Sequence, residues 1–132
     1  MKKSTVSKLS RLQRTILAHA GANRAIGVND DGTSCDLLYA EAYMKVWGLR
    51  PHFTYELGQT LRKKLMWGGW LWRDVDRGRF QSIRSSLCRA IQRLERRGLV
   101  RRWYAGGSDN WVGISLTDNG TTYLRETDNH LA

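Results

Sequence analysis

One stretch of this chain, residues 80 to 97, carries polar side chains whose chemistry suits a polyanion. Arginine can bond two acceptors of guanine at once, glutamine can do the same with adenine, and serine can bond either base. If the stretch is a helix in the major groove of duplex DNA, its first half presents the base-reading groups. We predict that base readout comes from Gln81, Ser82, Ser85, Arg89 and Gln92.

More basic side chains follow that stretch, and another basic cluster precedes it. Their charges suit phosphate oxygens, or the approach of a hairpin to the minor groove, and several such contacts would make affinity depend steeply on salt. Cations near the end of a helix also favour its dipole, which is a sufficient explanation for the earlier cluster. The predicted phosphate and hairpin contacts are Arg62, Lys63, Lys64, Arg93, Arg96, Arg97, Arg101 and Arg102.

Composition supports an anionic partner. The 132 residues include 22 Lys and Arg against 12 Asp and Glu, a formal net charge of +10. Such a surplus favours electrostatic capture of nucleic acid. The apolar runs are too short for a membrane-spanning helix, so we expect a cytoplasmic, nucleoid-associated protein.

Catalytic chemistry has little support in the sequence. There is no nucleophile elbow, phosphate-binding loop or metal-ligand spacing, and we predict no enzyme activity, no metal and no cofactor. Asp74 and Asp76 are close enough to share a cation, but three arginines between 73 and 79 neutralise them. Cys35 and Cys88 are expected to be free thiols.

The elements that would position the basic face are predicted by periodicity. Apolar residues recur at helical spacing through 80–97, from Ile83 to Leu94, and Gly98 stands where a helix C-cap belongs. Residues 99–104 and 111–116 alternate like two strands of a hairpin around a glycine-rich turn. Thr117 is the expected N-cap of a last helix that ends near Glu126.

This order resembles the winged helix-turn-helix module of the MarR-like and PadR-like transcriptional regulators. The resemblance covers about the second half of the chain. It implies an α+β, mostly helical winged-helix fold with a two-stranded wing, a helix 80–97 that reads DNA, and a homodimer that acts as a transcriptional repressor. MarR-like proteins often bind a small-molecule effector, which no residue here identifies. The matching residues are Ser85 or Ser86, Arg89, Ile91, Leu94, Glu95, Arg97, Gly98, Leu99, Val100, Leu116, Thr117 and Gly120.

The first half of the chain is predicted to supply the core helices of a single domain, 1–132, between a polar tail (1–6) and a loose tail (127–132). One helix begins at Ser7 and ends around Gly21 to Asn23. A second spans 36–47, capped by Ser34 or Asp36 and closed by Gly48, and a third begins at Thr54. Either 36–47 or 54–66 is the helix that precedes the recognition helix.

Three tryptophans around a glycine pair, Trp67, Trp70 and Trp72, are expected to pack in the core. A dimer interface or stacking on single-stranded bases remains open for them. Two other functions also remain open for the whole chain. One is a winged-helix assembly module in a replication or partition complex, and the other is a basic RNA-binding protein.

Overall fold

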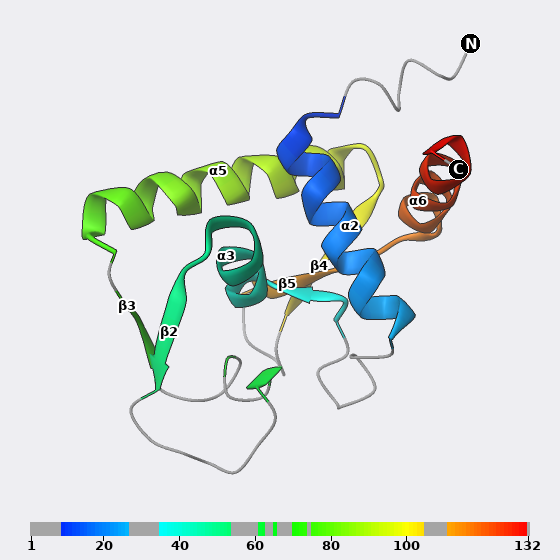
Figure 1. Cartoon of the computed structure of the whole chain (residues 1–132). Coiled ribbons are helices and arrows are strands. Elements are labelled where there is room, and N and C mark those ends of the chain that lie inside the picture. The colour runs from blue at the N-terminus through cyan, green and yellow to red at the C-terminus, as the bar shows by residue number, and fades with distance from the viewer. Residues whose placement is uncertain are drawn as a thin grey trace.

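The fold is mostly helical, with two small antiparallel sheets (Figure 1). The structure is a computed structural model that describes residues 9–26, 35–53, 61–62, 65, 70–73, 75–104 and 111–131. In chain order the elements are α2 (Arg11–Ala25), β1 (Leu37–Leu38), α3 (Tyr39–Trp47), β2 (Arg50–Phe53), β3 (Trp70–Arg73), α5 (Arg77–Arg96), β4 (Val100–Tyr104), β5 (Trp111–Leu116) and α6 (Asp118–Leu131).

The larger sheet has the strand order β1-β5-β4, and both of its pairings are antiparallel. Strand β5 is central: it pairs Ile114 with Leu37 of β1 and Leu116 with Val100 of β4. The two predicted strands of the second half are thus confirmed as a hairpin. A short strand from the first half of the chain extends this hairpin to a three-stranded sheet.

The core is closed by the inner face of α5, which lies against α2 and the sheet. The apolar residues predicted for that face are all buried, and Leu94 is fully inaccessible to solvent. Helix α2 contributes Ile16, Leu17 and Ala20, and β5 contributes Ile114. The apolar stripe of α5 therefore fixes which of its faces is left for solvent.

Helix α5 begins three residues before the predicted start at Phe80. Asp76 is its N-cap, because its side chain accepts a 2.7 Å hydrogen bond from the Arg79 amide. The helix ends at Arg96, and Gly98 follows with a φ of 75°, where a glycine costs least. The predicted C-terminal end is confirmed to within a residue.

The two earlier helices begin later than predicted. Helix α2 starts after Ser10, which forms a capping box with Gln13, and it runs through Gly21 to Ala25. A Cβ at position 21 would lie 2.6 Å from Leu124 of α6, so this glycine lets two helices approach closely.

Helix α3 begins at Tyr39 because residues 37 and 38 form β1 instead of helix. Asp36 is not its cap: that carboxylate accepts a hydrogen bond from the Leu116 amide at 2.7 Å. The Glu41 carboxylate caps the helix by accepting from the Leu38 amide. Gly48 closes the helix as predicted, with a φ of 70°.

Helix α6 is longer than predicted, because it continues to Leu131 where a loose tail from residue 127 was expected. Thr117 is confirmed as the residue that caps its start, since its hydroxyl accepts from the Gly120 amide. The Thr127 hydroxyl donates back to the Tyr123 carbonyl within the helix. The polar tail predicted for residues 1–6 lies outside the described residues.

A second hairpin, β2–β3, stands between α3 and α5 in the chain and was not predicted. Trp72 packs edge-on against Tyr43 of α3, with ring centroids 5.6 Å apart, and Tyr43 also contacts Phe80 of α5. Core packing is therefore confirmed for Trp72. Trp67, the side chain of Trp70 and most of the helix predicted from Thr54 lie outside the described residues.

The close approach of β1 to β5 gives a direct test of this sheet. A Cβ at Gly113 would lie 2.5 Å from the Leu37 carbonyl oxygen and 3.0 Å from the Cys35 sulfur. We expect Gly113→Ala to destabilise the protein by about 1–3 kcal/mol, as overpacking does. Urea-induced unfolding measures the loss, and Ser115→Ala on the same strand is the control. Equal midpoints for the two variants would contradict the strand pairing.

Candidate nucleic-acid interface

The outer face of α5 brings together all five residues predicted to read bases. Gln81, Ser82, Ser85, Arg89 and Gln92 are each exposed. Their spacing places them on one side of a helix whose opposite side is buried in the core. Asp76 and Gly98 delimit this helix, and at 20 residues it is the longest among the described elements.

The charge of this helix is almost entirely positive. Between residues 77 and 97 the chain has one acidic residue, Glu95. Arg93, Arg96 and Arg97, predicted to contact phosphate, are exposed. Three further arginines of this helix are exposed but were not among the predicted DNA contacts: Arg77, Arg79 and Arg84. The exposure of Arg84 follows from the same periodicity, whereas Arg77 and Arg79 precede the predicted start of the helix.

Two arginines of strand β4 differ in their surroundings. Arg101 is exposed, so it remains available to a phosphate. Arg102 is half-buried, and its guanidinium lies 3.2 Å from the Glu95 carboxylate of α5. That ion pair ties the hairpin to α5, which makes Arg102 a weaker candidate for phosphate contact than its neighbour.

Arg62 does not belong to the interface. Its side chain is 7% exposed, and its guanidinium donates to the Glu41 carboxylate at 3.1 Å and to the Cys35 carbonyl at 2.9 Å. A group that is buried and paired in this way cannot reach a phosphate on the surface. The prediction for Arg62 is therefore corrected, while Lys63 and Lys64 lie outside the described residues.

Arg62 is one member of a buried polar network that joins α2, β1 and α3. Glu41 also lies 3.5 Å from the side-chain nitrogen of Asn23, which donates to the Asp36 carbonyl at 2.9 Å. Lys45 donates to the oxygen of the Asn23 side chain at 3.0 Å. Buried polar groups need partners, and this network supplies them without involving the surface of α5.

The hairpin β4–β5 follows α5 directly, through Gly98 and Leu99. Its strands pair from Val100↔Leu116 to Tyr104↔Trp111, with an irregularity between Trp103 and Tyr104. The connection 105–110 lies outside the described residues. The approach of this hairpin to a minor groove therefore stays a prediction.

The described residues hold no cluster of three or more His, Cys, Asp or Glu side chains that would bind a metal ion. Cys35 is buried, and that burial raises the pKa of its thiol to about 12. A thiol in that state is a poor nucleophile near neutral pH.

Among the residues that the structure describes, no helix has the length and apolar character that crossing a bilayer requires.

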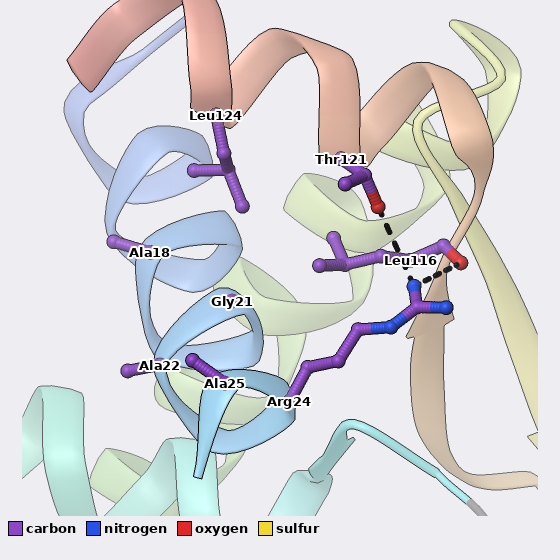
Figure 2. A pocket seen from close by; sticks show the side chains of 8 residues that line it. All are labelled: Ala18, Gly21, Ala22, Arg24, Ala25, Leu116, Thr121 and Leu124. Carbon is purple, nitrogen blue, oxygen red and sulfur yellow. Dashed lines mark hydrogen bonds between the residues drawn. The ribbon is translucent and has the colours of Figure 1, made fainter. Parts of the chain in front are cut away.

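A hollow of about 460 Å³ lies between α2, α6 and the end of β5 (Figure 2). Small and apolar side chains form most of its lining, including Ala18, Ala22 and Leu124. The charged group here is Arg24, which donates to the Leu116 carbonyl and the Thr121 hydroxyl, both at 3.4 Å. Among the described residues that line the hollow, none forms the pair of acid and base that catalysis would need, and none identifies an effector.

Comparison with family models, with curated proteins and with solved structures gave no match to this chain.

Proposed function

We propose that the chain is a winged helix-turn-helix protein that binds double-stranded DNA with sequence preference and acts as a transcriptional regulator. In this assignment α2, α3 and α5 form the helical core, α5 is the recognition helix, and β4–β5 is the wing. Strand β1 joins the wing to make the three-stranded sheet. The helix that precedes the recognition helix is then α3, with β2–β3 inserted between the two.

The observation that carries the proposal is the division of α5 into two faces. One face is buried in the core from Ile83 to Leu94, and the other exposes glutamine, serine and arginine together. Exposed arginines alone would suit any polyanion. Glutamine and serine alternating with arginine at helical spacing add the hydrogen-bonding groups that distinguish one base pair from another.

Anisotropy titration of a random-sequence duplex at two salt concentrations, followed by selection of preferred sites from a random pool, tests the proposal. We expect log K to fall by about 0.9 per log unit of salt for each phosphate neutralised. We also expect an enriched site. A two-fold symmetric site would support a homodimer.

Other outcomes would lead to other functions. Salt-sensitive binding without an enriched site would indicate a nucleic-acid coating protein, and preference for single strands would favour RNA binding. Absence of duplex binding at low salt would contradict the proposal and make the α5 face a docking surface for another protein.

A further inference from the structure

The hairpin β2–β3 has two chemically different faces. Along β2, exposed and half-buried residues alternate, so that Arg50 and His52 face solvent while Phe53 packs inward. On β3, Arg73 is exposed and Trp72 packs against Tyr43 and Phe80. The aromatic face therefore anchors the hairpin to the α3–α5 core and leaves a basic face outside.

The basic face places like charges opposite each other. Arg50 and Arg73 are direct partners in the strand register, so their side chains leave the same face of the ribbon. The Arg73 guanidinium also lies 2.6 Å from Nδ1 of His52, which is two pairs along the ribbon and therefore on the same face. This face therefore brings two guanidinium groups and an imidazole together on one side of the ribbon.

We propose that this face of β2–β3 is a second DNA-contacting element, which binds the phosphate backbone of the same duplex that α5 reads. The inference rests on the proposed function and gives a DNA-binding role to residues outside the predicted site. A guanidinium at each of two neighbouring positions can bond adjacent phosphate oxygens.

The position of the hairpin supports this role. Strand β3 of the hairpin leads toward the N-terminal end of α5, and α6 lies at the opposite side of the view (Figure 1). The first turn of α5 has no acidic residue and carries Arg77 and Arg79, both exposed. Arginines in a first turn oppose the helix dipole, so these two do not stabilise α5 through it. Exposed positive charge thus occurs at Arg73 of the hairpin and again at Arg77 and Arg79 of the recognition helix, with the exposed Asp76 between them.

The test compares salt dependence among variants of the full chain. The double variant Arg50→Gln, Arg73→Gln is titrated with random-sequence duplex DNA and with the selected site. We expect the slope of log K against log salt to fall by about 0.9 for each phosphate that the variant no longer neutralises. The decrease should be the same for both duplexes, because backbone contacts do not read sequence. Arg50→Lys, Arg73→Lys should retain the slope.

Arg125→Gln is the matched control, since it removes one exposed charge from α6. The single variants Arg50→Gln and Arg73→Gln are compared with it, and thermal unfolding shows that each is folded. A hairpin variant with the slope and affinity of Arg125→Gln would overturn the inference while leaving the function of α5 intact. A wild-type chain that binds no duplex would remove the proposed function and this inference together.

Discussion

Arg62→Met is expected to destabilise the protein by about 3–5 kcal/mol, because it removes one partner of a buried ion pair. Glu41 is 10% exposed at its side chain, and without Arg62 its carboxylate would keep the Leu38 amide at 2.9 Å and the more distant Asn23. These two uncharged donors do not compensate the negative charge of the Glu41 carboxylate as the guanidinium does. The Cys35 carbonyl, which accepts from Arg62, would also lose that bond.

Urea-induced unfolding measures this destabilisation, and a second variant separates charge imbalance from reduced packing. Glu41→Gln, Arg62→Met removes both charges, while the glutamine oxygen can still accept from the Leu38 amide. We expect the double variant to recover a large part of the stability, because removing both members of a buried pair costs much less than removing one.

Arg125→Met serves as the control, since exposed substitutions usually change stability by less than about 0.5 kcal/mol. If Arg62→Met unfolds at the same urea concentration as Arg125→Met, the buried pair does not hold its segment to the core. If Arg62→Met fails to fold, the double variant still reports whether the unpaired charge was the cause.

Arg62 also illustrates what local sequence patterns do not reveal. Its neighbours, two lysines near the end of an expected helix, suggested a basic cluster that contacts phosphate or favours the helix dipole. The residue that decides its role is Glu41, 21 positions earlier in the chain. Only the tertiary structure brings the two together, and no periodicity within either segment predicts the contact.

Periodicity did predict α5, because a long helix with one buried face repeats its signal over many turns. Its start was placed late because Arg77 to Arg79 add no apolar residue to that pattern, while the Asp76 cap does not depend on it. The outer face followed directly from the inner one. The five base-reading candidates were for this reason all found exposed.

Short strands were missed for the opposite reason. Strand β1 has two residues, too few to show alternation, and it exists because β5 offers it a partner far along the chain. Strand β3 contains closely spaced tryptophans, which suggested a core cluster instead of a ribbon. The basic face of that ribbon could not be recognised until the register was known.

The variant Arg89→Ala, Gln92→Ala is expected to lose affinity for the selected DNA site by at least about 30-fold. Each good bidentate contact to a base discriminates by about 1–3 kcal/mol, and the two residues lie three positions apart on the exposed face of α5. The loss of affinity should be much smaller on random-sequence duplex, because there the variant loses only the electrostatic attraction of the Arg89 charge. Competition titrations with the two duplexes measure this difference directly.

Two controls assign such a loss to base readout. Arg96→Ala removes an exposed charge from the same helix and should weaken both duplexes equally, because phosphate contacts carry no sequence information. Thr122→Ala, Arg125→Ala alters exposed residues of α6 and should leave both affinities nearly unchanged. If the Arg89, Gln92 variant keeps the wild-type ratio between the two duplexes, α5 does not read bases. The preference would then have to arise from the hairpins or from the shape of the DNA.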